Sequence, residues 1–308
     1  MSSNNYLVFD WGGTFLKYAI MDETTAILEK SKVPSPAIDD SVEDLYQRID
    51  PIIRQYQSEV KGIAVSMPGM LDDKTGYART SGALKFLAGS NVAKEMRERY
   101  GLPVSIENDG KAAALAEHWK GSLKGCSNCA VVIIGTGIGG GIILNNQLLV
   151  GKDFSAGEYS YMAVDERKTD TTDGYWCRYG HVGLSRMVAS RTGEDYQTLD
   201  GIEIFRRIRN HDEQAIAALK EFTYGYAVQI YNLSILLDLE KIAIGGGLSE
   251  DPLLMDYLNA GIRSFRERLP FGSENEHLPI AELVVCKYRN DANLIGALYH
   301  HLYGSWEK

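Results

Sequence analysis

The sequence has little positive charge, few cysteines and no long apolar run. Its 308 residues include 32 lysines and arginines against 41 aspartates and glutamates, which gives a formal net charge of −9. This charge repels a phosphodiester backbone and argues against nucleic-acid binding. No apolar run reaches membrane-spanning length, and Met1–Tyr6 has neither a basic nor an apolar leader segment. We therefore expect a cytoplasmic protein that binds neither nucleic acid nor membranes.

The four cysteines, Cys126, Cys129, Cys177 and Cys286, are too few and too scattered for a disulfide framework in a chain of this length. Cys126 and Cys129 form a CxxC pair, but no second pair follows and no thioredoxin-like pattern surrounds it. Two small apolar residues at a turn before a strand are the simpler interpretation. We expect reduced cysteines without a redox or metal function.

Length and hydrophobic patterning predict two α/β lobes. Single hydrophobic cores stop growing at roughly 250 to 300 residues, and strands alternate with helices along the chain. Three strands open each half, which suggests an ancient duplication. The predicted lobes are residues 1–120 and 121–290, with the C-terminal helical segment 291–308 returning to the first. The polar stretch 165–178 has no periodicity and predicts a surface loop.

Two glycine-rich turns, each entered from an apolar strand, are Asp10–Thr14 and Gly135–Gly141. Glycine accepts positive φ and lets main-chain N–H groups approach an anion without a Cβ in the way. The second turn leads directly into the apolar Ile142–Leu144, which indicates a hairpin and not the strand, loop and helix of a dinucleotide fingerprint. We predict that both turns bind one phosphate chain.

Asp10 ends the first strand just before its turn, and Lys17 follows four residues after Gly13. A carboxylate in this place can hold Mg²⁺ or its waters while N–H groups of the turn contact phosphate oxygens. The alternative is a carboxylate that only caps a hairpin, with a solvated lysine beside it.

Glu107–Gly110 falls where the predicted strand Leu102–Ile106 meets the predicted helix Gly110–Lys120. Asn and Asp are preferred N-cap residues, so Asn108 or Asp109 could simply cap that helix. However, α/β sheets place ligands at the carboxyl ends of their strands, and a carboxylate there can accept a hydroxyl proton.

In this order, the segments resemble the ROK family of bacterial sugar kinases, a branch of the actin-like ATPase and hexokinase superfamily. The resemblance spans nearly the whole chain. It implies a two-lobed α/β fold of the actin-like ATPase (ribonuclease H-like) type, with an interlobe cleft. The segments that carry it are Asp10–Thr14 with Lys17, Met67–Gly69, Glu107–Ala113, Gly135–Gly141, Ala156–Glu158 and Ile244–Gly247.

The resemblance also implies residue roles, with Asp109 as the general base. It implies ATP and Mg²⁺ as cofactors, with Asp10 holding Mg²⁺ through water or phosphate, and a homodimer. The implied nucleotide and phosphate-binding residues are Asp10, Gly12, Gly13, Thr14, Lys17, Gly135, Thr136, Gly137, Gly139, Gly245, Gly246 and Gly247. The implied sugar-binding residues are Gly69, Gly82, Asn108, Asp109, Glu158 and Tyr161.

The chain departs from the family at its zinc site. Many members bind a structural zinc through a Gly-His pair after the Ala-Gly-Glu motif and through a later CxCGxxGCxE segment. Here Tyr161 replaces the histidine, where it can offer a stacking face, and one thiolate cannot complete a four-ligand site. We expect no zinc, and we interpret the nearby His181 as a surface residue. In the later segment Cys177 remains, while the other ligand positions hold Tyr179 and Leu184 and the glutamate position holds Arg186.

A zinc-free sequence with Tyr161 and Arg186 at these two positions is similar to the Gram-positive β-glucoside kinase branch of the family. The expected reaction is phosphorylation of a hexose or β-glucoside at its 6-hydroxyl. The alternatives are an N-acetylmannosamine or N-acetylglucosamine kinase, a glucokinase, or a catalytically weak sugar-binding regulator. The DNA-binding repressors of the family carry an N-terminal helix-turn-helix domain, for which a first strand starting near Tyr6 leaves no room.

Overall fold

The computed structural model describes residues 4–304, and the chain divides into two compact units. The first comprises the described parts of Met1–Lys120 and Asn290–Lys308 together with Leu148–Ala156, and the second comprises Gly121–Gln147 and Gly157–Arg289. The sequence prediction assigned all of 121–290 to the second lobe and differs from this division at Leu148–Ala156 and at Asn290. Leu148–Ala156 belongs instead to the first unit, to which side-chain contacts described below attach it.

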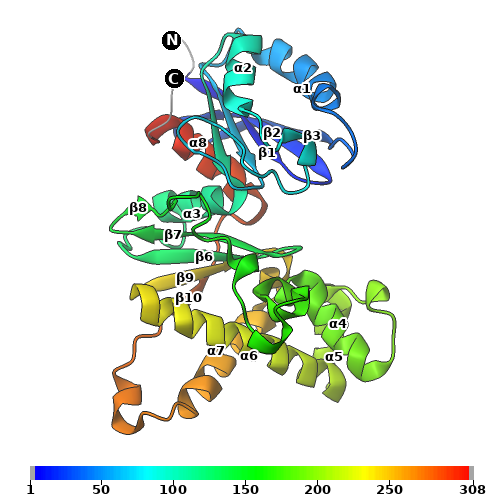
Figure 1. The fold of residues 1–308 in the computed structure, drawn as a ribbon, viewed down its shortest axis with the longest axis vertical. Coiled ribbons are helices and arrows are strands. Elements are labelled where there is room, and N and C mark those ends of the chain that lie inside the picture. The colour runs from blue at the N-terminus through cyan, green and yellow to red at the C-terminus, as the bar shows by residue number, and fades with distance from the viewer. Residues whose placement is uncertain (1–3, 305–308) are drawn as a thin grey trace. The chain divides into compact units, whose positions relative to one another are not determined.

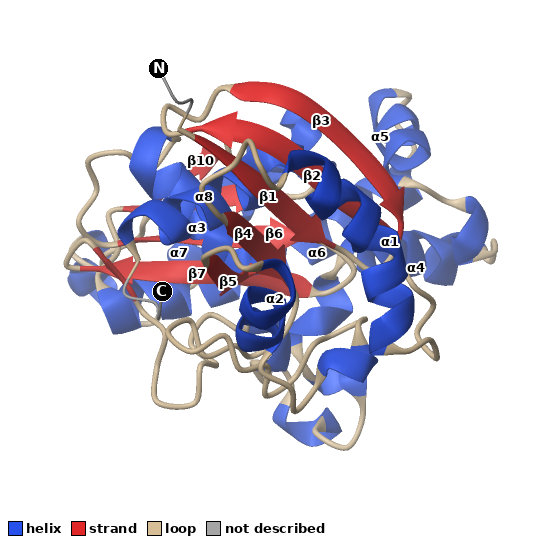
Figure 2. Cartoon of the chain, turned by 90° about the horizontal axis from the view of Figure 1, so that it is seen from above, coloured by secondary structure: helices blue, strands red, loops and turns tan. Residues whose placement is uncertain are grey.

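The first unit is built on a five-stranded sheet with the order β3-β2-β1-β4-β5 (Figures 1 and 2). β1 pairs antiparallel with β2 and parallel with β4, which pairs parallel with β5. The carboxyl ends of β1, β4 and β5 therefore lie at one edge of the sheet. The strands are β1 (Asn5–Trp11), β2 (Phe15–Asp22), β3 (Ile27–Pro34), β4 (Ile63–Met67) and β5 (Val104–Asn108).

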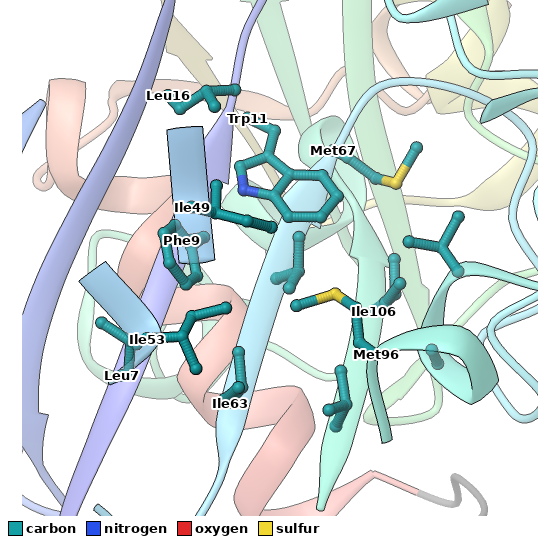
Figure 3. Close-up of a cluster of buried hydrophobic side chains, with 14 of the residues drawn as sticks. Leu7, Phe9, Trp11, Leu16, Ile49, Ile53, Ile63, Met67, Met96 and Ile106 are labelled. Atoms are coloured by element: carbon teal, nitrogen blue, oxygen red, sulfur yellow. The ribbon is translucent and has the colours of Figure 1, made fainter. Parts of the chain in front are cut away.

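Helices complete the first unit: α1 (Val42–Tyr56), α2 (Val92–Tyr100), α3 (Asp109–Lys120) and α8 (Ala292–Tyr303). Apolar side chains of α1 and α2 join those of the sheet in one buried cluster, and Figure 3 shows the indole of Trp11 among Leu16, Ile49 and Met67. α3 and α8 cross very closely, since a Cβ at Gly296 would lie 1.7 Å from the carbonyl oxygen of Ala112. This contact brings the C-terminal helix against the helix that begins at Asp109.

The second unit repeats the sheet topology of the first. Its order is β10-β9-β6-β7-β8, with β6 antiparallel to β7 and parallel to β9, which is parallel to β10. The repeated three-strand pattern of the sequence thus corresponds to a repeated sheet. The strands are β6 (Cys129–Ile134), β7 (Ile138–Leu144), β8 (Gln147–Leu148), β9 (Lys241–Gly245) and β10 (Glu282–Val285), and the helices are α4 (His181–Thr192), α5 (Gly201–Arg209), α6 (Glu213–Leu237) and α7 (Pro252–Glu267).

The predicted surface loop at 165–178 forms short 3₁₀ turns, of which the last is η5 (Trp176–Tyr179). Most of its side chains are exposed, but Trp176 is fully buried. Its ring centroid lies 5.5 Å from that of Tyr159 and 5.5 Å from that of Tyr226 on α6. The surface prediction is therefore wrong for Trp176, because Tyr159 and, from a distant helix, Tyr226 pack against it.

The CxxC pair is buried. Burial raises the pKa of the Cys126 thiol and raises the pKa of Cys129 to about 12. A thiol whose pKa is raised has little thiolate at neutral pH, so both side chains are poor nucleophiles. Among the described residues, no helix combines the length and the apolar composition needed to cross a bilayer.

Candidate active site

Three of the sequence motifs meet at the carboxyl edge of the first sheet. β1 ends beside the first glycine turn, β4 ends at Met67 before Pro68 and Gly69, and α3 begins at Asp109 directly after β5. Asn108 Nδ2 donates to the Gly69 carbonyl oxygen at 2.8 Å. A Cβ at Gly82 would lie 2.8 Å from Cβ of Pro68. The structure thus brings the predicted sugar-binding residues Gly69, Gly82 and Asn108 together.

The three polar residues at the end of β5 have different surroundings. Glu107 is buried, its Oε1 accepts the Asn108 N–H at 2.8 Å, and its Oε2 lies 3.5 Å from Nδ1 of the buried His300. Asn108 caps α3, because its Oδ1 accepts the Lys111 N–H at 3.0 Å. The capping interpretation is therefore right for Asn108. Asp109 is the residue of the three that does not cap the helix and that keeps part of its surface exposed.

The Asp109 carboxyl is held in position by a backbone N–H group. Its Oδ1 accepts the Gly110 N–H at 2.8 Å. Burial is the main cause that raises the pKa of the Asp109 carboxyl, and the negative charge of Asp10 raises it further, against the opposing effects of the Gly110 N–H and of Lys111. A carboxyl with a raised pKa and a partly exposed surface has the properties of a general base.

Asp10 is buried and both of its carboxylate oxygens have partners. Lys17 is its cross-strand neighbour in the β1–β2 register, and Lys17 Nζ lies 3.1 Å from Asp10 Oδ2. Asn293 Nδ2, at the start of α8, donates to Asp10 Oδ1 at 3.0 Å. Lys17 is therefore paired with Asp10, while part of its side chain remains exposed. No sequence pattern indicated Asn293, because it lies at the far end of the chain.

Two cationic side chains attach Leu148–Ala156 to the first unit. The buried Lys111 of α3 donates from Nζ to the Phe154 carbonyl oxygen at 3.1 Å. Arg79, three residues before Gly82, forms an ion pair with Asp153 at 2.9 Å. No pattern in the sequence indicates either contact. They fix the segment that leads directly into the predicted sugar-binding motif at Gly157 and Glu158.

The second glycine turn lies at the carboxyl edge of the second sheet. Gly135, Thr136 and Gly137 connect β6 to β7, and Gly139 lies within β7 opposite Ile133. β9 runs parallel to β6, and a Cβ at Gly246 would lie 2.2 Å from the carbonyl oxygen of Ile134. The structure therefore brings the predicted phosphate-binding residues 135–137 and 245–247 together.

The short 3₁₀ turn η2 (Tyr159–Tyr161) packs against β7. A Cβ at Gly157 would lie 3.2 Å from the carbonyl oxygen of Gly140, and one at Gly140 would lie 2.6 Å from the ring of Tyr159. Glu158 is partly exposed and the side chain of Tyr161 is 68% exposed. Both predicted sugar-binding side chains in this motif thus lie on the surface of the second unit, beside its glycine-rich strand.

The segment that aligns with the zinc-binding cysteines has an apolar interior. Leu184 is fully buried, and the ring centroid of Tyr179 lies 6.1 Å from that of Tyr226. The Cys177 thiol donates to the carbonyl oxygen of Thr172 at 3.7 Å. Within residues 4–304, no group of three or more His, Cys, Asp and Glu side chains could hold a metal ion. His181 is exposed as predicted, but its Nδ1 lies 3.0 Å from the Gly135 carbonyl oxygen.

Comparisons with known proteins place this arrangement in a family. The family model described as ROK family matches residues 6–302. The chain belongs to the ROK family. It is 33% identical over 298 residues to the β-glucoside kinase of Listeria monocytogenes, and this alignment covers 96% of each chain. The family and the fold class predicted from the sequence are therefore confirmed.

Two solved ROK structures have the same fold. A ROK family protein from Streptococcus pneumoniae in complex with sucrose superposes with a TM-score of 0.85 at 27% identity, covering 97% of this chain and 98% of that chain. A ROK family glucokinase from Streptomyces griseus in complex with glucose and AMPPNP superposes with a TM-score of 0.79 at 25% identity, covering 96% and 98%. These ROK structures contain a sugar or a sugar with an ATP analogue.

Proposed function

We propose that this protein is an ATP-dependent sugar kinase that phosphorylates a hexose or β-glucoside, with the 6-hydroxyl as the acceptor. The observation that carries the proposal is the position of Asp109. This carboxyl, whose pKa is raised by burial, lies at the same sheet edge as Asp10 and the first glycine turn. The similarity to a β-glucoside kinase supports the choice of substrate.

In the proposed reaction, Asp109 accepts the proton of the sugar hydroxyl. The hydroxyl oxygen forms a bond to the γ-phosphorus while the bond from that phosphorus to the β,γ-bridging oxygen breaks, and ADP leaves. Asn108 and Glu158 would orient the sugar hydroxyls, with Gly69 and Gly82 bordering them. The N–H groups of the two glycine turns would bind phosphate oxygens of one nucleotide.

The surroundings of Asp10 fit Mg²⁺. This ion keeps several waters and is commonly held by one or two carboxylates plus substrate phosphates, so it does not need a cluster of protein ligands. Asp10 would supply that carboxylate, with Lys17 and Asn293 fixing its orientation. When bound, Mg²⁺ supplies positive charge that neutralises the phosphates.

We also propose that the enzyme acts in the cytoplasm as a homodimer, as the family resemblance implies. Sedimentation at micromolar concentration tests the dimer, because a single species with the mass of one chain contradicts it.

A coupled ADP-release assay tests the proposed function. The panel is glucose, mannose, fructose, N-acetylglucosamine, N-acetylmannosamine, cellobiose and gentiobiose. We expect the β-linked disaccharides to be phosphorylated at least as efficiently as glucose, because the exposed Tyr161 ring offers a stacking face beside the sugar. A preference for glucose would indicate a glucokinase, as in the Streptomyces griseus relative. ADP release that no sugar stimulates would reject the kinase.

The pH dependence of kcat/KM should show the effect of burial on Asp109. A base must be deprotonated, so activity falls as the pH drops through the pKa of Asp109 in the free enzyme. Because this pKa is raised, the fall should start at a higher pH than an ordinary exposed aspartate would give. The measurement is kcat/KM between pH 4 and pH 8 with direct quantification of ADP. Full activity down to the range of an exposed aspartate would contradict the assignment of the base.

A further inference from the structure

In the first unit, a serine holds the carbonyl groups of the glycine turn. Ser35 directly follows β3. Its hydroxyl donates to the Gly12 carbonyl oxygen at 2.5 Å, and its N–H donates to the Thr14 carbonyl oxygen at 3.0 Å. The Gly12 N–H is also used inside the hairpin, where it donates to the Phe15 carbonyl oxygen at 3.0 Å. Two carbonyl oxygens of this turn are therefore bound by Ser35.

In the second unit, the hydroxyl of Ser160 also binds a backbone carbonyl beside the glycine turn. The Ser160 hydroxyl, on η2, accepts the Ile138 N–H at 2.9 Å and donates to the Ile138 carbonyl oxygen at 3.1 Å. The Gly135 carbonyl oxygen accepts the His181 N–H at 2.8 Å, and His181 Nδ1 lies 3.0 Å from the same oxygen. The Gly137 carbonyl oxygen accepts the Gly135 N–H at 3.0 Å. The carbonyl oxygens that flank the tip are thus bound as well.

The remaining N–H groups are at the tips of the turns. In the part of the chain that the structure describes, no hydrogen bond is formed by the N–H groups of Gly13 and Thr14 or by those of Thr136 and Gly137. Gly13, Thr14 and Thr136 are exposed. Backbone N–H groups attract a phosphate and carbonyl oxygens repel it, so a turn binds phosphate best when its carbonyls are held elsewhere.

We propose that Ser35 and Ser160 are positioning residues of the two phosphate-binding turns. Each hydroxyl binds one backbone carbonyl of its turn, that of Gly12 or that of Ile138, and keeps it turned from the nucleotide, so that the N–H groups at the tip stay available to phosphate oxygens. The inference rests on the proposed function, in which these turns bind ATP. It is carried by two separate observations, because the serines belong to different units and contact different turns.

The absence of a side chain at Gly137 leaves room for the Ser160 hydroxyl. A Cβ at Gly137 would lie 2.5 Å from the Ser160 hydroxyl oxygen. An alanine there would push the hydroxyl away from Ile138 and break the same contact that Ser160→Ala removes. The two substitutions should therefore not be additive.

The test uses the full-length enzyme with Ser35→Ala and Ser160→Ala. The net contribution of one hydrogen bond corresponds to about a two- to tenfold change in an equilibrium constant, so KM for ATP should rise by about that factor, with KM for the sugar unchanged. ATP affinity measured by calorimetry in the absence of sugar should fall equally. Ser35→Thr, which keeps the hydroxyl, should restore the wild-type KM.

Ser90→Ala and Ser190→Ala are matched controls. Their hydroxyls also donate to backbone carbonyls, to Leu87 at 2.8 Å and to Met187 at 2.9 Å, but neither carbonyl belongs to a glycine turn. We expect wild-type KM for ATP in both. The inference is wrong if Ser35→Ala and Ser160→Ala match these controls, or if they raise KM for both ATP and the sugar while lowering the melting temperature. Either result leaves the proposed function intact. A wild-type protein that binds no ATP overturns the proposed function and the inference with it.

The double variant Gly137→Ala with Ser160→Ala completes the test. If both changes remove one contact, its KM for ATP should equal that of the worse single variant. If the increase in KM is instead the product of the increases in the two single variants, Gly137 and Ser160 act independently. That result would contradict a shared contact.

Discussion

The Asp109→Asn enzyme should turn over about 10²- to 10⁴-fold more slowly than the wild type, the usual contribution of a positioned general base. Asparagine has nearly the same size and keeps an oxygen that can accept the Gly110 N–H, as Asp109 Oδ1 does at 2.8 Å. It cannot take up the proton of the attacking hydroxyl. The measurement is kcat for ADP release at saturating ATP and sugar.

Asp39→Asn is the control for the loss of one negative charge. Asp39 is exposed in the loop before α1 and belongs to the same unit, so its kcat should equal that of the wild type. The melting temperature and the ATP affinity of Asp109→Asn should also stay close to the wild-type values. Near-normal turnover by Asp109→Asn would show that another group accepts the proton, and the proposed mechanism would be wrong.

Trp176→Ala should lower the free energy of unfolding by about 3 to 5 kcal/mol, the usual cost of removing a large buried aromatic side chain. Trp176 is fully buried between the rings of Tyr159 and Tyr226. Its removal leaves a cavity beneath η2, which carries the proposed positioning residue Ser160. Urea unfolding followed by far-UV circular dichroism measures the change.

Trp176 directly precedes the segment 177–186, for which the family resemblance implies a zinc site in many members and for which we expect no zinc here. A zinc chelator should therefore leave the unfolding free energy unchanged. Ile202→Ala is the control substitution, because this side chain is 83% exposed and its loss should change stability by less than about 0.5 kcal/mol. Chelator-dependent unfolding would contradict the expected absence of zinc, and a Trp176→Ala effect as small as that of the control would contradict a structural role for Trp176.

The site could be predicted from the sequence where its chemistry is local. Asp10 and Asp109 stand out as candidates because glycine turns and helix N-termini act on residues a few positions away. The contacts that hold these carboxylates were not found. Asn293 is 283 positions from Asp10, and Lys111 is 43 positions from Phe154, and no periodic pattern connects such pairs.

The ends of strands and helices also depend on contacts that no local pattern indicates. β5 continues to Asn108 and α3 begins at Asp109, whereas composition predicted a strand ending at Ile106 and a helix from Gly110. α4 begins at His181, whereas the sequence predicts this helix only over Leu184–Thr192. Both differences lie where another element pairs with the backbone: Asn108 pairs with Met67 of β4, and the His181 N–H donates to the Gly135 carbonyl oxygen. Tertiary partners extended elements that propensity alone would end.

The sequence by itself determined the order and type of the strands and helices, the two glycine turns and the identity of the candidate base. Periodicity, capping and glycine conformation act over a few residues, so one chain is enough to read them. Only the tertiary structure decided that Leu148–Ala156 joins the first unit, that Trp176 is buried, and that Ser35 and Ser160 bind the carbonyls of the turns. Those outcomes depend on which side chains meet after the chain has folded, and hydrogen bonds and apolar burial between distant residues leave no local pattern in the sequence.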